Sequence, residues 1–426
     1  MAQENRRVRN GFGAIGAILC AALATLIAAP EPGAAAEPIK LGIDLGMTGA
    51  NGPTSGQILL SLQIWRDDVN AKGGLLGRPV EIVYYDDQTN PANVPGNITK
   101  LIDVDRVELM LGPYGTNLIA AAIPIIMQHS MTTVGILGLA ANSAYHYPRY
   151  FSMIPTGPNP KIAFSEDFFN LAMAQNPKPK MVAIVGADAE FGKTATDGAR
   201  ENAKAAGLTI VYDQRYPPST VDFSPIVRAI QATNPDIVFI ASYPTDSVNM
   251  IRAVNEVGLE PKMIGGAMIG LLVNNLKMQL GPAINGFVQN EVFVPGPTFN
   301  FPGVQELLKK YQAQAPSLHI DPLGYSFAPL AYAAAQVMAD AVEATKGLDQ
   351  SKLAEYIRAH SFDTVMGHVT FGPDGEWAKP RLVFFQFQHL AVHDLDQFRD
   401  TTHQVILAPP EYKTGTMIYP FADARK

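Results

Sequence analysis

The sequence predicts an α/β protein made of two three-layer lobes, each with a parallel sheet between layers of helices. Short apolar segments alternate with longer helical patterns, and the connections between them are short. This alternation is typical of parallel strands joined by helices that cover both faces of a sheet. It breaks between Tyr150 and Pro160, where prolines follow one another closely, and then starts again. A length of 426 residues is sufficient for two or three domains with cores of their own.

The first block runs from Glu37 to the proline-rich segment. Lys72-Gly73-Gly74 follows its first long helical pattern and supplies the flexible residues of a helix C-cap. The expected helices span residues 53–71, 91–104 and 118–128. The expected strands are Ile39–Leu45, Val80–Asp87, Val107–Gly112 and Thr132–Leu137.

The second block repeats this rhythm and ends at Gly281, which is well placed to terminate its last helix. The expected helices span residues 162–175, 193–206, 223–233, 248–257 and 271–280. The expected strands are Met181–Gly186, Thr209–Tyr212, Asp236–Ser242 and Met263–Gly265.

The rest of the chain is less regular. Asp374-Gly375 lies between two apolar runs, which predicts a hairpin of Val365–Phe371 and Arg381–Phe387. Ala408–Lys426 contains three prolines, and we expect it to wrap a lobe as irregular structure. Helices are expected at residues 304–315, 325–345 and 351–360.

Composition and charge exclude several classes of protein. The chain is 47% hydrophobic and 17% charged, too apolar for a disordered chain and too mixed for a bundle of membrane spans. A formal charge of −7 argues against a nucleic-acid-binding protein, which usually has a basic surplus. The one cysteine, Cys20, allows no intrachain disulfide framework and no zinc site built on several thiolates.

The N-terminus has the pattern of a secretory signal peptide. Three arginines lie within the first nine residues, an uncharged run follows over residues 11–30, and three alanines precede Glu37. This pattern predicts a leader of residues 1–36 that is cleaved after Ala36. The alternative is an N-terminal membrane anchor, since the apolar run approaches the spanning minimum of about 17 residues. Arg6-Arg7 gives a weak indication of twin-arginine export, which leaves the export route open.

Signatures of catalysis are few. Gly192-Lys193-Thr194 is similar to the end of a phosphate-binding loop, but Ala187 stands where that loop needs glycine. His389 and His393 have the spacing of a zinc-binding pair without the glutamate that should follow the first histidine. Asp86-Asp87 could form a metal or acid–base pair, although solvation of a strand end explains it better. An enzyme function therefore remains open only with a site assembled from residues that are distant in the sequence.

Two loops of the first block are suited to holding a small molecule. Ligands of parallel α/β sheets bind beyond the carboxyl ends of the strands. Thr48 and Gly49 follow the first expected strand, and Tyr114 and Thr116 follow the third. The unpaired N–H groups of a helix N-terminus, together with a hydroxyl, can bind a carboxylate or carbonyl. Ordinary N-capping explains these residues equally well.

Two aromatic residues, Phe191 and Tyr243, occupy the corresponding loops of the second block. Each either belongs to the core or, in a cleft, stacks on an apolar or aromatic part of a ligand.

A family resemblance is carried by Asn70–Pro79 and by Tyr85–Pro91. Both closely resemble the leucine/isoleucine/valine-binding type of solute-binding protein, the extracytoplasmic receptors of ABC importers. The resemblance extends in order over nearly the whole chain after the leader. It includes Gly112-Pro113-Tyr114, Ala189–Lys193, Val221–Ser224, Asn234-Pro235-Asp236 and Asp363–Gly367.

The resemblance implies the type I periplasmic binding protein fold, in which two lobes are joined by a hinge of three crossings. We expect the crossings near Ile154–Pro160, Asn290–Phe293 and Asp363–Gly367. No single cut in the sequence then separates the lobes. Lobe 1 is expected to comprise residues 37–155 and 292–362, and lobe 2 residues 156–291 and 363–426 with the C-terminal tail.

The family function implied is transport. A small organic ligand, an amino acid or a related or aromatic carboxylate, is captured between the lobes and favours the closed state through its extra contacts. A membrane permease of an ABC importer then recognises that state. We therefore expect a periplasmic protein that acts as a monomer and is not an enzyme, with no catalytic residue, no metal and no cofactor.

The family's ligand contacts carry over to several positions. Thr116 matches a serine that holds the ligand carboxylate, and it keeps the hydroxyl. Tyr243 matches a tyrosine of the second lobe, and Phe191 stands where the family often has tyrosine. The loop after the fourth expected strand, which includes Gly138 and Leu139, has no hydroxyl before Ser143, unlike the hydroxyl-rich loop of the family.

One family contact is missing. The acid that neutralises the ligand ammonium in amino-acid binders should lie near Ala267, where all the neighbouring residues are uncharged. A buried ammonium without a partner costs several kcal/mol, so a ligand without a free α-ammonium is indicated, such as an aromatic or apolar carboxylate or an amide. Asp188 or Asp246 could replace the missing acid, which leaves amino acids open.

Two other classes of function are weighed against transport. A ligand-sensing receptor module uses the same two lobes, but we expect no spanning helix or signalling domain after them. An exported amidase or hydrolase is disfavoured because no nucleophile motif is present.

Overall fold

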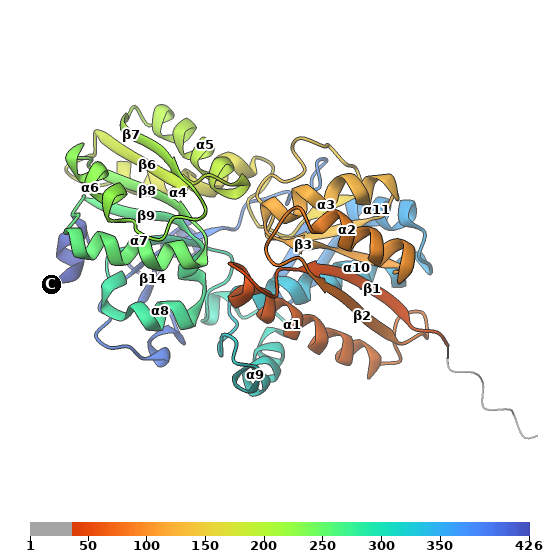
Figure 1. Ribbon diagram of the computed structural model, residues 1–426. Coiled ribbons are helices and arrows are strands. Elements are labelled where there is room, and N and C mark those ends of the chain that lie inside the picture. Colours follow the sequence, from red (N-terminus) through yellow and green to blue (C-terminus); the bar gives the residue numbers. More distant parts are fainter. Residues whose placement is uncertain (1–35) are drawn as a thin grey trace, which may run out of the picture. The chain divides into compact units, whose positions relative to one another are not determined.

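Two sheets organise the described part of the chain, residues 36–426 of a computed structural model (Figure 1). The expected leader, residues 1–36 with Cys20, lies outside the described residues except for Ala36. Among the described residues, none of the helices is both long and apolar enough to cross a membrane.

The first sheet has five strands in the order β2-β1-β3-β4-β5, and every neighbouring pair is parallel. Alternate residues of β3 pack into different clusters: Leu109 and Leu111 join α1, and Met110 joins α2 and α3. Because successive side chains of a strand point to opposite faces, helices cover both faces of this sheet. The elements are β1 (Ile39–Leu45), α1 (Gly52–Asn70), β2 (Val80–Asp86), α2 (Val94–Thr99), β3 (Leu109–Tyr114), α3 (Thr116–Gln128), β4 (Thr133–Ile136) and β5 (Tyr150–Ser152).

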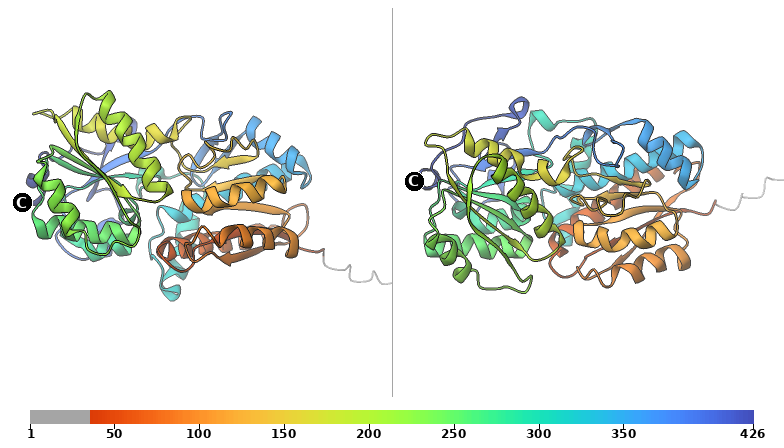
Figure 2. Two further views of the ribbon diagram at one scale, coloured as in Figure 1. Left: turned by 45° about the horizontal axis from the view of Figure 1, so that its top comes forward. Right: turned by 90° about the horizontal axis from the view of Figure 1, so that it is seen from above.

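The second sheet has seven strands in the order β14-β13-β10-β9-β8-β6-β7. Strands β6 to β10 are parallel, whereas β13 pairs antiparallel with both β10 and β14. Figure 2 shows this sheet and its helices from two further directions. The elements are α4 (Pro160–Met173), β6 (Met181–Ala187), α5 (Glu190–Ala205), β7 (Thr209–Tyr216), α6 (Ser224–Ala232), β8 (Ile237–Ser242), α7 (Pro244–Val257), β9 (Met263–Met268), α8 (Asn274–Leu280), β10 (Val288–Glu291), β13 (Val383–Phe387) and β14 (Gln404–Ala408).

The chain passes three times between the sheets. It leaves the first sheet after β5, and it returns after β10 to form α9 (Val304–Gln314), α10 (Phe327–Thr345) and α11 (Gln350–Ala359). The helix α10 packs on α1, β3 and β4, so it completes the cover of the first sheet. The third passage leads to β13, and the N–H of Arg381 there donates to the carbonyl of Pro155 in the first passage at 2.8 Å.

The turn expected at Asp374-Gly375 forms and is closed by a bridge between Phe371 and Trp377, but the two strands expected to flank it do not pair with each other, so the expected hairpin is wrong. β12 (Gly367–Thr370) pairs with β11 (Ser361–Thr364), and β13 pairs with β10 and β14 instead. Gly367 and Gly375 both have a φ of 77°, which glycine adopts without strain, so both turns form and the strand partners are decided by packing elsewhere in the sheets. Since α10 contacts β11, this hairpin stays beside the first sheet, and the third passage lies later than the expected 363–367.

Other differences are local. The helix expected at 91–104 is α2 followed by a π-helix at Lys100–Val104, and the strand expected at 209–212 extends to Tyr216. The strands β5, β10, β11 and β14 were not among the expected strands. β5 has only three residues and lies at the start of the proline-rich segment, so it carries no periodic signal.

Close helix packing at Gly198 gives a first testable prediction. A Cβ atom at this position of α5 would lie 1.9 Å from the carbonyl oxygen of Lys161 in α4. Gly198→Ala is therefore expected to lower the free energy of unfolding by about 1–3 kcal/mol in urea denaturation. Gly96→Ala is the matched control, because this helical glycine has nothing within 4 Å of its Cβ position. We expect the control to be neutral or to stabilise by about 0.5 kcal/mol, and equal effects would contradict the prediction.

Candidate ligand-binding site

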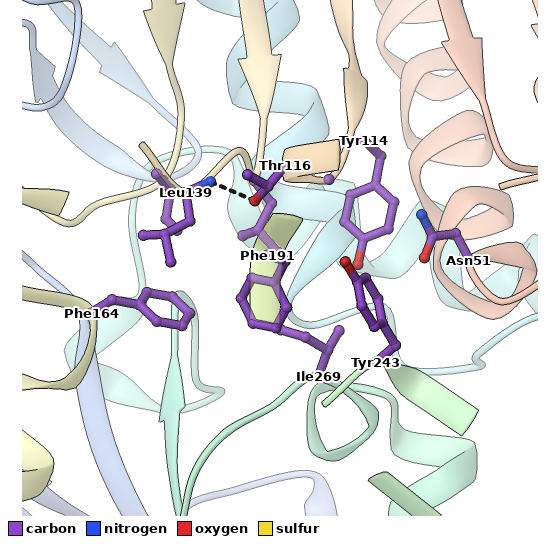
Figure 3. A pocket seen from close by; sticks show the side chains of 11 residues that line it. Asn51, Tyr114, Thr116, Leu139, Phe164, Phe191, Tyr243 and Ile269 are labelled. Atoms are coloured by element: carbon purple, nitrogen blue, oxygen red, sulfur yellow. Dashed lines mark hydrogen bonds between the residues drawn. The ribbon is translucent and has the colours of Figure 1, made fainter. Parts of the chain in front are cut away.

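A small cavity of about 20 Å³ lies between loops that follow the strands of both sheets, so a ligand larger than a water molecule enters only when these loops move apart. Figure 3 shows the side chains of its 11 lining residues. None of these residues carries a charge, and most are apolar or aromatic. They are Asn51, Tyr114, Gly115, Thr116, Leu137, Leu139, Ile154, Phe164, Phe191, Tyr243 and Ile269.

One end of the cavity is formed by the junction of β3 and α3. Gly115 precedes the helix with φ 96° and ψ 149°, a conformation that other residues rarely adopt. It turns the chain so that Thr116 begins α3 at the cavity. The Thr116 hydroxyl oxygen accepts the N–H of Leu139 at 3.0 Å, so its hydrogen can be donated to a ligand (Figure 3). The first N–H groups of a helix have no partner within it, so this end suits a carboxylate.

The loop after β4 is held in an unusual conformation. Leu137 and Ala140 have φ values of 55° and 50°, in the left-handed region that non-glycine residues rarely adopt. Gly138 packs closely behind this loop, where a Cβ atom would lie 2.5 Å from Ile119. Leu137 and Leu139 line the cavity. Strained conformations of this kind cluster at active sites, ligand clamps and switch regions.

Aromatic side chains from the second sheet's helices form the opposite wall. Phe191, at the start of α5, contacts Phe164 of α4 edge to face with ring centroids 5.8 Å apart. It makes a similar contact with Tyr243, which precedes α7, at 5.6 Å. The Tyr243 hydroxyl donates to the side-chain oxygen of Asn117 in α3 at 3.4 Å and so links the two halves of the site. The three rings present edges and faces to the cavity.

Two neutral polar residues complete the lining. Asn51 precedes α1 and is buried. Tyr114 is also buried, with its ring edge on Phe327 at 5.4 Å, and burial raises the pKa of its hydroxyl, as it does for Tyr243. Figure 3 shows the hydroxyls of Tyr114 and Tyr243 pointing toward one another. Both phenols therefore stay protonated and act as hydrogen-bond donors or acceptors without charge.

Of the nine residues proposed from the sequence, five line this cavity: Tyr114, Thr116, Leu139, Phe191 and Tyr243. Gly138 stands between two lining residues, Leu137 and Leu139, but does not itself line the cavity. The Thr48 hydroxyl donates to Asp86 at 2.8 Å, and a Cβ atom on Gly49 would lie 2.6 Å from the carbonyl oxygen of Gln88. Both residues therefore pack against the loop after β2 instead. Ala267 is buried inside β9, and Ile269 reaches the cavity in its place.

The cavity also contains residues that sequence reasoning missed, notably Ile154, Phe164 and Ile269. Ile154 lies in the first passage between the sheets, so its contacts are with residues distant in the sequence. Phe164 belongs to an amphipathic helix and has the pattern of a core residue. Asn51 could have been proposed from the sequence, because it lies in the same polar loop as Thr48 and Gly49.

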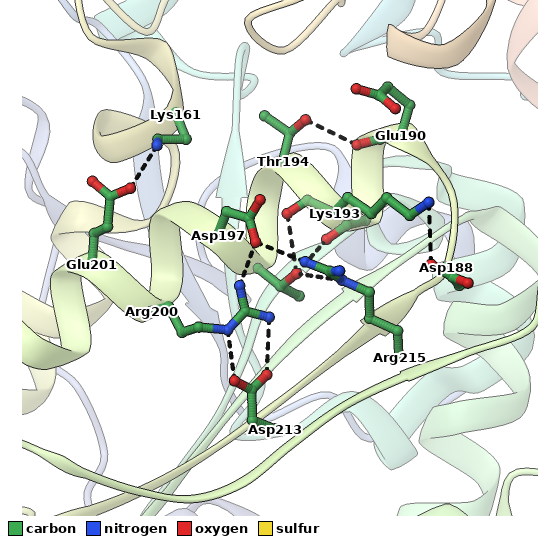
Figure 4. Close-up of polar contacts among 12 residues, drawn as sticks. Lys161, Asp188, Glu190, Lys193, Thr194, Asp197, Arg200, Glu201, Asp213 and Arg215 are labelled. Carbon is green, nitrogen blue, oxygen red and sulfur yellow. Dashed lines mark hydrogen bonds and ion pairs between the residues drawn. The ribbon is translucent and has the colours of Figure 1, made fainter.

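The two acids considered as replacements for the missing family acid do not line this cavity. Asp188 lies 3.3 Å from the ammonium of Lys193, beside the ion pairs of Arg200 and Arg215 on the surface of α5 and β7 (Figure 4). Asp246 accepts the hydroxyl of Tyr216 at 2.8 Å, and burial raises its pKa. It faces a second cavity on the other side of Tyr243.

The acidic pair Asp86-Asp87 does not form a metal centre with its neighbours. Asp86 accepts from Thr48, and Asp87 accepts the N–H of Thr89 at 2.6 Å. Within residues 36–426, no three His, Cys, Asp or Glu side chains are grouped to hold a metal ion.

Comparison with known proteins decides the family. The sequence pattern of the family described as periplasmic binding protein matches residues 38–389. The chain belongs to this family. Its members are extracytoplasmic solute-binding proteins that work with the membrane permeases of ABC transporters, so the resemblance noted in the sequence is confirmed.

The periplasmic binding proteins similar to this chain include curated relatives and solved structures. Leu/Ile/Val-binding protein homolog 8 of Brucella abortus (strain 2308) is 25% identical over 357 residues, which cover 79% of this chain and 86% of that protein. The branched-chain amino acid transporter substrate binding protein LivJ from Streptococcus pneumoniae, solved with isoleucine, has a TM-score of 0.69 at 17% identity. The match covers 84% of this chain and 97% of that one.

A second solved structure is a solute binding protein of an ABC transporter from Rhodopseudomonas palustris HaA2, in complex with p-hydroxybenzoic acid. It has a TM-score of 0.73 at 18% identity and covers 92% of this chain and all of that one. These likenesses confirm the type I periplasmic binding protein fold, with parallel sheets covered by helices.

Proposed function

We propose that the protein captures a small aromatic or apolar carboxylate in the cavity between its lobes and delivers it to an ABC importer. One observation carries this proposal: the 11 lining residues are uncharged, and the cavity combines a helix N-terminus with aromatic walls. A ligand carboxylate finds donors at one end, whereas an ammonium finds no acid among the lining residues.

The carboxylate is proposed to lie at Thr116. The threonine hydroxyl and the first N–H groups of α3 donate to it, and the positive end of the helix dipole favours a negative charge there. The carboxylates of Glu190 and Asp246 lie beyond Tyr243, along a second cavity. These acids would repel a ligand carboxylate on that side. They therefore also favour the orientation in which the carboxylate lies at Thr116.

The apolar part of the ligand is proposed to pack against Phe164, Phe191 and Tyr243. An aromatic ring can adopt the edge-to-face contacts that these rings already make with one another. The complex of the Rhodopseudomonas palustris protein with p-hydroxybenzoic acid supports an aromatic acid. The isoleucine complex of LivJ keeps amino acids as the alternative.

A thermal-shift panel followed by calorimetric titration tests the ligand class. The panel contains benzoate, 4-hydroxybenzoate, benzamide, leucine and succinate. An aromatic acid at 100 times its dissociation constant should stabilise the protein by about 2.7 kcal/mol. Micromolar binding of leucine without any response to the aromatic acids would contradict the proposal.

Substitution of Thr116 tests the carboxylate position. Thr116→Val is expected to weaken benzoate binding about tenfold, because it removes one charge-assisted hydrogen bond. Thr116→Ser keeps the hydroxyl and is expected to bind benzoate within about threefold of the original protein. The dissociation constants are measured by calorimetry, and equal losses for Val and Ser would show that the hydroxyl is not the ligand contact.

The remaining parts of the proposal concern export and assembly. We propose that residues 1–36 direct export and are cleaved after Ala36, and that the mature chain acts as a monomer without turning over its ligand. Lobe 1 is proposed to contain residues 37–155 and the return segment from 292, and lobe 2 residues 156–291 and the C-terminal part. The pairing of β11 with β12 supports moving the third boundary from residue 363 to just after Trp377.

A further inference from the structure

A second cavity of about 440 Å³ lies beside the first, between α3 and the starts of α5 and α7. We call the first the inner cavity and the second the outer chamber. Of the lining residues in the described part of the chain, Tyr243 alone belongs to both. The others that line the outer chamber are Ala50, Thr89, Pro91, Asn117, Ala120, Ala189, Glu190, Pro218 and Asp246.

Tyr243 is held in place from three directions. Its ring packs edge to face on Phe191, with centroids 5.6 Å apart. Its hydroxyl donates to Asn117 of α3 at 3.4 Å, and its backbone N–H donates to the carboxylate of Asp246 at 3.2 Å. The ring therefore stands as a wall whose base is fixed at the start of α7 and whose tip reaches the opposite half of the site.

We propose that Tyr243 sets the maximum length of the ligand and restricts the inner cavity to carboxylates with a single ring. This proposal rests on the proposed function, because it assumes that a carboxylate lies at Thr116. A ligand anchored there extends toward the aromatic wall, and a second ring in line with the first meets the side chain of Tyr243. The outer chamber behind it has room for such a ring and is lined partly by small apolar residues, among them Ala50, Ala120 and Pro218.

Replacement of the ring is therefore expected to join the two cavities. Tyr243→Ala removes the shared wall, whereas Tyr243→Phe keeps the ring and removes only the hydroxyl. Asn117→Ala removes the acceptor of the hydroxyl on the other half of the site and also keeps the ring. If the ring of Tyr243 sets the maximum length of the ligand, only Tyr243→Ala should allow a longer ligand to bind.

The test compares benzoate with biphenyl-4-carboxylate by calorimetric titration of the mature protein and the three variants. The unaltered protein, Tyr243→Phe and Asn117→Ala are expected to bind biphenyl-4-carboxylate at least tenfold more weakly than benzoate. Tyr243→Ala is expected to bind it at least as tightly as benzoate, which is a reversal and not merely a loss. Thermal unfolding of each variant verifies that it is folded.

The possible failures are distinguishable. If the unaltered protein binds both acids equally, or if Tyr243→Ala keeps the preference for benzoate, the length limit is overturned while the proposed function stands. If neither acid binds to any of the four proteins, the proposed function fails and the length limit fails with it.

Discussion

3-Phenylpropanoate is expected to bind at least 100-fold more tightly than L-phenylalanine. The two molecules differ only by the α-ammonium, and all of the residues that line the inner cavity are uncharged. Burial of an ammonium without a partner costs several kcal/mol, and a factor of 100 corresponds to about 2.7 kcal/mol. Calorimetric titration of the same preparation with both ligands measures the ratio directly.

A charge placed at Ile269 should weaken this preference. Ile269 lines the inner cavity two residues after Ala267, near which the family's acid was expected. Ile269→Asp is expected to improve phenylalanine binding relative to 3-phenylpropanoate by at least tenfold, because a carboxylate then faces the ammonium. Asparagine has nearly the same shape as aspartate but carries no charge. Ile269→Asn should therefore keep the preference for 3-phenylpropanoate unchanged. Tight phenylalanine binding by the unaltered protein would mean that another acid reaches the ligand.

Asp44→Asn is expected to stabilise the protein by several kcal/mol at pH 8 and to have little effect near pH 4. Asp44 lies in β1, is fully buried, and accepts the side-chain amide of Asn97 at 2.9 Å. Burial raises its pKa from 3.8 to about 8, and the carboxylate of Asp87 adds to the rise. Burial likewise raises the pKa of Asp87, to about 6.

The direction of the pH dependence follows from proton binding. Between about pH 4 and pH 8 the folded protein keeps the Asp44 proton, whereas the unfolded chain has released it. The stability that Asp44 contributes is therefore complete below pH 4 and is lost as the pH rises toward 8. Each unit of pKa difference corresponds to about 1.4 kcal/mol, which makes several kcal/mol the upper limit of the loss. The side chain of asparagine can accept the hydrogen bond from Asn97 and does not ionise, so Asp44→Asn avoids this loss of stability.

Urea denaturation between pH 4 and pH 8 measures this effect. The neighbouring Asp86 is the control of opposite sign. Burial alone would raise its pKa, but the N–H of Gln88 and the hydroxyl and N–H of Thr48 outweigh burial and lower it. Asp86→Asn should therefore destabilise by a constant amount across this pH range, and the difference should shrink only below about pH 4, as the pH falls through the lowered pKa of Asp86. Parallel pH profiles for Asp44→Asn and the unaltered protein would contradict the assignment of a buried neutral Asp44.

The main strands were predictable because each is an apolar run between polar connections. Ile39–Leu45 and Ile237–Ser242 are buried along nearly their whole length, as strands covered on both faces should be. Prediction failed where pairing is decided by contacts distant in the sequence. β13 joins β10 instead of β12, and no local pattern distinguishes those two partners.

The site was predictable where it follows the geometry of strand ends. Thr116 and Tyr243 lie where loops after β3 and β8 begin, and both line the inner cavity. Thr48 occupies an equivalent loop, but its hydroxyl is taken by Asp86. Phe164 could not be found, because its role depends on how α4 packs beside α5, and the sequence shows only an apolar helix face.

The late position of α10 bears on how the protein matures. The strands of the first sheet are complete at Ser152, whereas α10, which covers one face of it, begins at Phe327. A nascent chain that stops between these points exposes Val134 and Leu111 of the sheet to water, along with the other apolar side chains of that face. Fragments truncated before α10 should therefore aggregate, and a chaperone that delays folding until the whole chain is available would favour export.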